Sequence, residues 1–250
     1  MRVLVLLCVL LFVALQTWES RYQSTRWRYP LVVVIYPIAA DASAVTQRYV
    51  AALDAARIAP IDRFFAREAH RHGVAERDPV ETRLRAALTQ RPPVYAAGSG
   101  TLATVLWSLR LRYWAWRVSG AVFPAYVRMF VLYVDPALTP TVPHSLGIEK
   151  GLLGVVYAFA SPAMDGANDV IIAHELMHTL GATDKYAAGD DAPQFPDGYG
   201  DPRQVPLFPQ RMAELMAGRR LVAPDRWVQP VSLDQVVIGP ASAREIRWPR

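Results

Sequence analysis

The sequence predicts an α+β fold, because runs of β-branched residues are interspersed with segments whose apolar residues recur at helical spacing. Three runs have the composition of buried strands, namely residues 29–39, 125–136 and 151–162. The last run leads into a segment with helical spacing, residues 168–180. We therefore expect a mixed sheet that packs on this helix.

Three further segments in the first half of the chain predict helices. Residues 48–71 have apolar side chains at helical spacing, and Pro60 is expected to kink or divide that helix. Residues 80–88 predict a second, shorter helix. In residues 101–118 helical spacing competes with a near alternation of apolar and polar residues, and we favour the helix.

The second half of the chain contains a long stretch that is rich in turn-forming residues. This stretch covers residues 187–210, and a loop of such length in a compact domain usually has a function or is mobile. The segment that follows, RMAELMAGRR at residues 211–220, predicts a short helix that ends near Gly218.

The N-terminus has the pattern of an export signal. An unbroken apolar run, residues 3–15, follows Arg2. Thirteen helical residues rise about 20 Å, less than the roughly 30 Å hydrocarbon core of a bilayer, so a membrane span would also use residues 16–18. No clear small-residue cleavage site follows, which favours an uncleaved signal anchor over a cleaved signal peptide.

These features divide the chain into two parts. Residues 1–28 would form the signal peptide or signal anchor with a connector, and residues 29–250 one folded domain. We expect this domain to be exported, or held at a membrane by the N-terminal helix, on the extracytoplasmic side. Arginines on both sides of the apolar run leave its orientation undetermined by charge.

Composition excludes several other classes of protein. The 250 residues are 52% apolar, which is enough for a sizeable core and unlike a disordered or fibrous chain. The single cysteine, Cys8, lies in the N-terminal apolar run, so the folded part has neither disulfides nor thiolate metal ligands. The net charge of +5 comes from scattered arginines without a nucleic-acid-binding motif, and no nucleic-acid partner is expected.

The segment NDVIIAHELMHTLGATDKY, residues 168–186, combines helix signals with side chains that bind metals. Asn168 is a good N-cap, and Gly181 can adopt the left-handed conformation that ends a helix. On a helix, His174 and His178 lie one turn apart on one face, where both rings can grip one ion. Glu175 is rotated by about 100° and can reach a metal-bound water without binding the metal.

This H-E-x-x-H arrangement predicts a catalytic site with one Zn²⁺ ion. Zinc lowers the pKa of its water toward neutrality, and the glutamate takes the proton during attack on a carbonyl. Two histidines are too few, because a catalytic zinc normally has three protein ligands and one open position. Candidates for the third ligand are Asp184, which Gly181 could turn back under the metal, Glu214, and His144, for which no spacing argument exists. We favour Asp184 over Glu214.

His174, Glu175, His178, Gly181 and Asp184 together reproduce the pattern H-E-x-x-H-x-x-G-x-x-D. The pattern resembles that of the metzincin zinc peptidases, in the snapalysin-like variant in which Asp replaces the usual third His. The continuation GATDKY is similar to that of a set of bacterial zincin-like proteins with N-terminal apolar segments.

The resemblance implies a zincin-like fold, a hydrolase that cleaves a protein or peptide substrate, and zinc ligands at His174, His178 and Asp184 with Glu175 as the catalytic residue. In metzincins a downstream turn places a methionine beneath the zinc, and Met216 is the candidate for that role, although a Met near a Gly is as often simple core.

A second hypothesis is a zincin-like envelope protein that binds zinc or a protein partner without hydrolysis. Residues 187–210 would then fill the cleft. An accessible fourth metal position would favour catalysis over this alternative.

Overall fold

A computed structural model describes residues 24–94, 100–120, 126–142, 145–148, 152–187, 189 and 191–249. The predicted N-terminal anchor and the candidate ligand His144 lie outside these residues. Within them, no helix is both long enough and apolar enough to cross a membrane.

The centre of the fold is a five-stranded mixed sheet with the strand order β2-β1-β3-β5-β4. Four strands are parallel, and only β4, at one edge, runs antiparallel to its neighbour β5. The strands are β1 (Leu31–Ala39), β2 (Val80–Leu84), β3 (Val127–Val134), β4 (Leu146–Ile148) and β5 (Leu153–Phe159). The strands predicted at residues 29–39, 125–136 and 151–162 are thereby confirmed.

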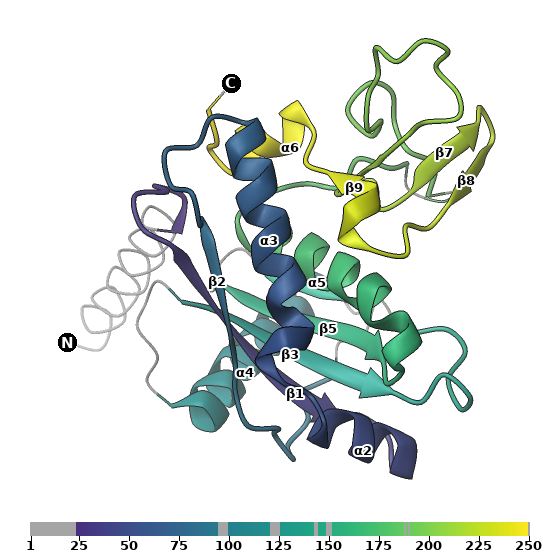
Figure 1. The fold of residues 1–250 in the computed structure, drawn as a ribbon. Coiled ribbons are helices and arrows are strands. Elements are labelled where there is room, and N and C mark those ends of the chain that lie inside the picture. Colours follow the sequence, from purple (N-terminus) through teal and green to yellow (C-terminus); the bar gives the residue numbers. More distant parts are fainter. Residues whose placement is uncertain are drawn as a thin grey trace.

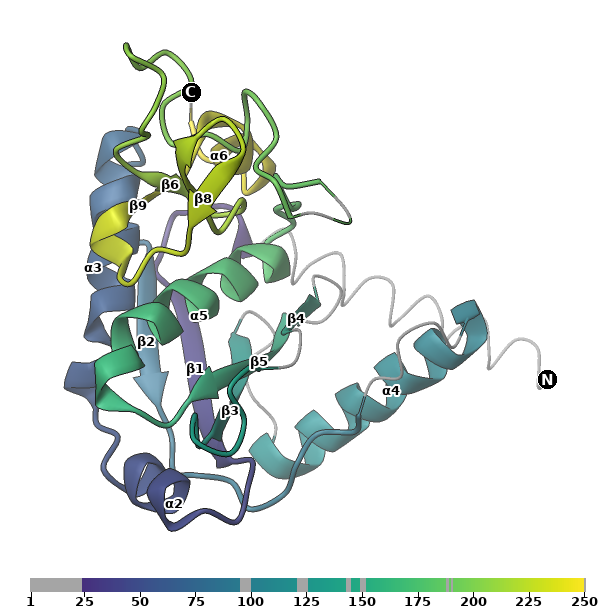
Figure 2. The ribbon, with the colours of Figure 1, turned by 90° about the vertical axis from the view of Figure 1, so that its right-hand side faces the viewer.

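Helices cover both faces of the sheet, as Figures 1 and 2 show. Along β1, Val33 and Ile35 face the core under α3 and α5, whereas Val34 and Tyr36 face α4 on the other side. This alternation follows from the two-residue period of a strand. The helices are α2 (Ala44–Ala51), α3 (Ala55–Arg71), α4 (Gly100–Ser119) and α5 (Asp165–Thr179).

The C-terminal part packs across the ends of α3 and α5 (Figure 1). It contains β6 (Ala213–Glu214), β7 (Arg220–Ala223), β8 (Arg226–Val228), β9 (Val236–Val237) and α6 (Pro240–Glu245). β6 pairs with β9, and β7 pairs with β8. Trp27, from the predicted connector, packs edge-on against Trp248 with ring centroids 5.5 Å apart. The two ends of the described chain therefore share one core.

Two predicted helices are wrong. The helix predicted for residues 80–88 is replaced by strand β2, which pairs in parallel with β1. The helix predicted for residues 211–220 is replaced by β6, a turn and the start of β7. Both segments contain good helix formers, but each lies beside a strand with unpaired backbone groups, and sheet pairing outweighs local propensity.

The helix predicted for residues 48–71 is divided, but not at Pro60. The break falls between α2 and α3, where Asp54 caps α3 by accepting a hydrogen bond from the backbone of Arg57. Pro60 lies inside α3 and does not end it. The helix predicted for residues 101–118 is confirmed as α4.

Candidate metal centre

Helix α5 begins three residues before the predicted cap. It starts at Asp165, so Asn168 is not the N-cap. The Asn168 side chain instead bonds to both backbone groups of Phe159, accepting from its N–H at 2.9 Å and donating to its carbonyl at 2.8 Å. A buried amide that satisfies a strand end in this way fixes α5 against β5.

The two sides of α5 differ in the way the sequence predicted. Its apolar side is buried in the core, through Ile172, Ala173, Leu176, Met177 and Leu180. The side chains of His174 and His178 are 15% and 20% exposed, so both rings remain partly accessible to solvent.

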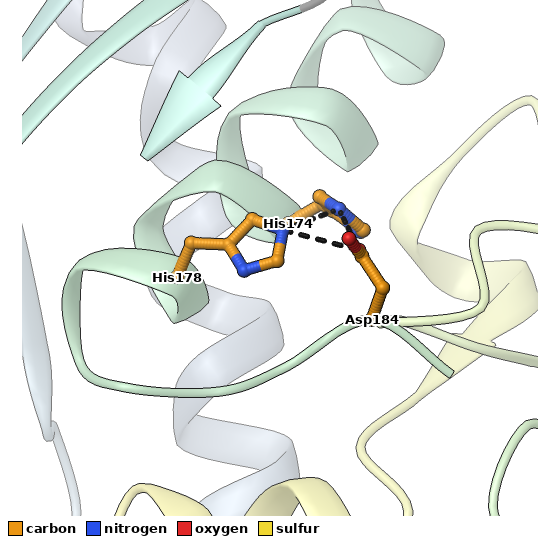
Figure 3. A group of neighbouring side chains, drawn as sticks. All are labelled: His174, His178 and Asp184. Atoms are coloured by element: carbon orange, nitrogen blue, oxygen red, sulfur yellow. Dashed lines mark hydrogen bonds and ion pairs between the residues drawn. The ribbon is translucent and has the colours of Figure 1, made fainter. Parts of the chain in front are cut away.

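The end of α5 turns the chain back toward these rings. Gly181 has a φ of 99°, its N–H donates to His178 O, and the next N–H, of Ala182, donates to Met177 O. This pair of bonds is the Schellman motif, which needs a left-handed residue and therefore favours glycine. The turn carries Asp184 to the histidine pair (Figure 3).

Three side-chain atoms converge at this point. Asp184 Oδ1 lies 3.2 Å from His174 Nε2 and 3.1 Å from His178 Nε2. The two Nε2 atoms are 3.0 Å apart. Among the described His, Cys, Asp and Glu residues, only these three form a group that could hold a metal ion.

The contacts of Nδ1 in each histidine ring show which ring nitrogen carries the proton. His174 Nδ1 lies 2.9 Å from the carbonyl oxygen of Leu215, and His178 Nδ1 lies 2.8 Å from that of Ala182. A carbonyl oxygen only accepts, so both Nδ1 atoms carry the proton, and a neutral ring then has a lone pair on Nε2. Two lone pairs and a carboxylate oxygen thus point at one another, an arrangement that a cation stabilises.

The donor set fits zinc. In a tetrahedral site with bonds of about 2.0 to 2.1 Å, neighbouring ligand atoms are about 3.3 Å apart, close to the spacing of the three atoms here. A histidine that binds a metal through one ring nitrogen usually donates the N–H of the other to a carbonyl or carboxylate, as both rings do here. His174, His178 and Asp184 would therefore hold the ion, with the exposed side of Asp184 leaving access to it.

Charge on the group is consistent with this fit. Burial tends to raise the pKa of Asp184, but the two histidines outweigh it, and the pKa lies well below its usual range. Burial tends to lower the pKa of His178, whereas Asp184 and the Ala182 carbonyl raise it, and the net pKa is raised.

Glu175 lies beside this group in a different environment. The residue is 6% exposed, and its Oε2 atom is buried without a hydrogen-bond partner. Burial raises the pKa of Glu175, His174 and His178 lower it, and Asp184 raises it further. A carboxylate with a raised pKa and a free oxygen is suited to accept and return a proton.

Strand β4 supports the back of Glu175. A Cβ atom on Gly147 would lie 2.5 Å from the Glu175 carbonyl oxygen, 2.5 Å from His178 Cβ and 3.3 Å from Glu175 Oε2. Only glycine allows the edge strand to approach the helix this closely. Gly147 was not predicted from the sequence, since a lone glycine in a short strand has no distinguishing pattern.

The ligand loop is held by α6. Glu245 accepts hydrogen bonds from Thr183 N at 2.9 Å and Thr183 Oγ1 at 2.8 Å, and from Lys185 Nζ at 2.8 Å. Its carboxylate thus binds the residues on both sides of Asp184. Glu245 was not predicted from the sequence either, because nothing local marks a residue about sixty positions away.

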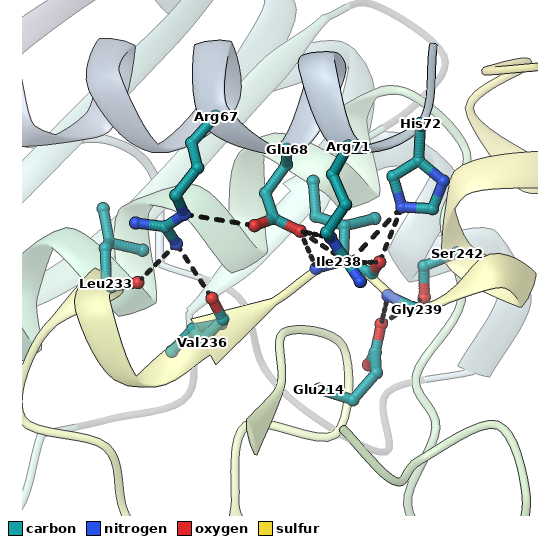
Figure 4. Close-up of polar contacts among 10 residues, drawn as sticks. All are labelled: Arg67, Glu68, Arg71, His72, Glu214, Leu233, Val236, Ile238, Gly239 and Ser242. Carbon is teal, nitrogen blue, oxygen red and sulfur yellow. Dashed lines mark hydrogen bonds and ion pairs between the residues drawn. The ribbon is translucent and has the colours of Figure 1, made fainter. Parts of the chain in front are cut away.

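Glu214 is engaged elsewhere and does not join the histidines. Its carboxylate accepts from Gly239 N at 3.0 Å and Ser242 Oγ at 2.7 Å (Figure 4), and also from Ala217 N at 2.9 Å. Burial raises the pKa of Glu214, and these donors lower it. The alternative third ligand therefore has a different role: it fixes the turn after β6, whose Leu215 carbonyl binds His174.

A second buried glutamate holds the same C-terminal segment from the opposite side. Glu68 on α3 accepts from Ile238 N at 2.8 Å and pairs with Arg67 and Arg71 (Figure 4). The adjacent amides of Ile238 and Gly239 are thus bound by glutamates of two different elements. The β9–α6 segment, and with it Glu245, is anchored to the helix layer.

Met216 lies in the turn that follows β6 and is fully buried. It comes directly after Leu215, and its own carbonyl accepts from Lys185 N at 3.0 Å. Residues 215–218 therefore form a turn close to His174 in place of the expected helix.

The site opens into a cleft of about 570 Å³. His174, Glu175 and Tyr186 line one part of it, and apolar residues of α5 and β5, including Val170 and Phe159, line another. Burial, and then the charge of Asp184, raises the pKa of Tyr186 to about 12, which keeps its hydroxyl protonated. A cleft of this size and mixed lining is typical of a ligand-binding site.

No protein-family model matches this chain, and no curated protein matches it significantly.

Proposed function

We propose that this protein is a metzincin-like, zinc-dependent metallopeptidase. The observation that carries the proposal is the convergence of His174 Nε2, His178 Nε2 and Asp184 Oδ1 within 3.2 Å of one another, with both Nδ1 atoms committed to carbonyls. The unpaired oxygen of Glu175 beside them, in an open cleft, supports hydrolysis over a structural zinc site.

The roles follow from the chemistry of each side chain. His174, His178 and Asp184 would hold one Zn²⁺ ion, which when bound would lower the pKa of a water molecule and polarise a carbonyl group. Glu175 accepts a proton from the attacking water and later delivers it to the departing amine nitrogen. The raised pKa of Glu175 allows both steps.

The sheet edge supports a peptide as substrate. β4 is the last strand in the sheet order, and residues 140–142 and 145, which precede it, line the cleft. The outer edge of an edge strand offers backbone N–H and C=O groups to which an extended peptide can bind as an added strand. A peptide bound there would lie along β4, the strand that packs against Glu175 of α5 through Gly147.

The predicted N-terminal segment indicates where the protein would act. With residues 3–15 as signal anchor or export signal, the catalytic domain would act outside the cytoplasm, at the membrane or released from it.

One observation favours the second candidate, a zincin-like envelope protein that binds zinc or a partner without hydrolysis. Asp191, from the long loop, lines the cleft and forms an ion pair with Arg219 at 2.5 Å. The pair closes part of the cleft with a segment of the chain itself. Asp184 is still 39% exposed, so the metal position keeps access to solvent.

A direct test compares the full chain with Glu175→Gln. Both proteins are loaded with zinc, their metal content is measured, and cleavage of a fluorogenic peptide library is followed. We expect equal zinc content and a loss of activity of about 100-fold or more in the variant. Equal activity of the two proteins would contradict the role of Glu175, and a zinc-loaded native protein that cleaves no peptide would favour the second candidate.

A further inference from the structure

Helix α4 is apolar on two opposite faces. Its inner face packs on the sheet, through Trp107, Leu111, Trp114, Ala115 and Val118. Its outer face bears six large apolar side chains that are 49% to 74% exposed, namely Leu102, Val105, Leu106, Leu109, Tyr113 and Trp116. In the described part of the chain, no element covers this outer face.

The six side chains form one continuous stripe. At 100° per residue they fall within an arc of about 100°, which is the width of a buried helix face in a globular protein. Tyr113 and Trp116 are neighbours within the stripe, with ring centroids 6.0 Å apart. A contiguous apolar surface of this kind marks an interaction site rather than the scattered apolar residues of an ordinary surface.

The charges around the stripe have one sign. α4 contains no aspartate or glutamate. Arg110 and Arg117 are exposed and follow one border of the stripe, and Arg112 follows the other. Burial lowers the pKa of Arg112, yet an arginine keeps its charge in proteins.

The position of α4 relates this surface to the N-terminal segment. Ser119, at the end of α4, accepts a hydrogen bond from Arg128 of β3 at 3.3 Å. Tyr126, just before β3, shares a surface cavity with Ser24 and Arg28. The chain therefore enters the described structure at the edge where α4 ends. Eight residues lie between Leu15 and Ser24, so an anchor at residues 3–15 would keep this edge within about 30 Å of the bilayer.

We propose that the outer face of α4 lies on the surface of an anionic phospholipid bilayer. Leu, Trp and Tyr side chains would enter the interfacial region while the bordering arginines meet lipid phosphates, as in amphipathic helices that lie in a membrane surface. A second copy of the chain fits less well, because two such stripes in contact would bring arginines together without acidic partners.

Docking through α4 leaves the cleft free. The sheet separates α4 from α5, so a membrane beneath α4 faces away from His174 and His178 (Figure 2). This inference is independent of the proposed peptidase activity, and its test contains no activity measurement.

The test places a fluorescent probe on the stripe. The full chain with Cys8→Ser and Leu109→Cys is labelled and reconstituted into vesicles of phosphatidylcholine and phosphatidylglycerol with brominated acyl chains, which quench on contact. The matched control carries the probe at Val205, which is 90% exposed on the long loop. We expect quenching of at least about twofold at position 109 and none at position 205.

Three other outcomes would overturn the proposal. A probe at position 109 that is unquenched and open to aqueous iodide would show that the stripe contacts no lipid. A probe shielded from iodide without lipid quenching, with the thiol of the Leu109→Cys variant cross-linking between two chains, would identify a second copy as occupant. In a second, unlabelled Leu109→Cys protein that keeps the natural Cys8, a cross-link between these two thiols of the same chain would identify residues 1–23 as occupant.

The anionic character of the surface is tested separately. Substitution of Arg110 and Arg117 by glutamine should weaken docking of α4 by about fivefold per residue. Docking should also be weaker on vesicles of phosphatidylcholine alone. The control pair is Arg203→Gln with Arg211→Gln, two exposed arginines in and directly after the long loop. Docking that is equally strong on neutral vesicles would contradict an anionic partner.

Discussion

The Nε2 atoms of His174 and His178 lie 3.0 Å apart, and the Nδ1–H of each ring forms a hydrogen bond to a backbone carbonyl. Two ring nitrogens with lone pairs repel each other at this distance, and a cation bound by both would remove the repulsion. Asp184 adds a negative charge to the same point. The group is therefore preorganised for a cation, and its response to metal can be predicted residue by residue.

Asp184→Asn should weaken zinc binding most strongly. The amide keeps the size of the side chain but removes the negative charge, so we expect the dissociation constant for zinc to rise by about 100-fold or more. Loss of a residue that only supports a ligand typically costs about 10- to 100-fold, and loss of a ligand should cost at least as much. Titration against a zinc-sensitive dye measures the dissociation constant. Asp191→Asn, in the adjoining cleft but outside the group of three side chains, is the control and should change the dissociation constant little. Equal effects of the two substitutions would contradict a ligand role for Asp184.

Glu245→Gln should loosen the ligand loop without removing a ligand. The change weakens the bonds to Thr183 and Lys185, and we expect zinc affinity to fall by about 10-fold and stability by about 1 to 3 kcal/mol. Calorimetric zinc titration and urea unfolding measure the two effects. Glu81→Gln, whose partner Arg83 is on the surface, is the control. A loss of stability with unchanged zinc affinity would show that Glu245 does not position Asp184.

Gly147→Ala should damage the site through the backbone. The new Cβ atom would press on Glu175 O and His178 Cβ, which cannot move without shifting α5. Gly154→Ala is the matched control, because its Cβ would meet only the flexible side chain of Met129. We expect both variants to lose about 1 to 3 kcal/mol of stability. Only Gly147→Ala should also lose zinc affinity, and an identical zinc titration curve for both would refute this role of β4.

The metal-free protein should lose stability as the pH rises from about 4 to 7. Burial, and then the nearby Asp165, raises the pKa of Asp169 from 3.8 to about 7, whereas Arg63 lowers it. The folded state then binds more protons at Asp169 than the unfolded chain in this range, so the contribution of Asp169 to stability is largest below pH 4 and is lost as the pH rises through 7. The loss from this residue is at most about 4 kcal/mol.

Asp169→Asn isolates this effect. The neutral amide should reduce the difference between urea midpoints at pH 5 and pH 8, measured with a chelator so that metal ligands do not contribute. Substitution of the exposed Asp225 by Asn is the control. A variant with the full pH dependence of the native protein would show that Asp169 does not carry it.

Much of the candidate site could be predicted because its information is local. His174, Glu175 and His178 are related by helical spacing, and Gly181 ends the helix with a conformation that few other residues adopt. Asp184 follows three residues later. A contiguous stretch of eleven residues therefore contains the whole group that converges in the structure.

The supports of the site could not be predicted in the same way. Leu215 and Glu245 reach the ligands from 41 and about sixty residues away, and a backbone carbonyl or a lone glutamate has no sequence signature. Glu214 had the chemistry of a ligand, and only its three hydrogen-bond donors show that it faces the C-terminal segment instead.

The sequence by itself determined the strongly β-branched strands, helix α5 with the side that carries His174 and His178, and the turn that follows. Tertiary structure decided the segments in which local preference was weak: β2 and β6 became strands because neighbouring strands offered unpaired backbone groups. It also explains the mixed pattern of α4, which came from apolar residues on both faces, only one of which the sheet buries. Local pattern records which residues are apolar, whereas the packing of the whole chain decides which of them are covered.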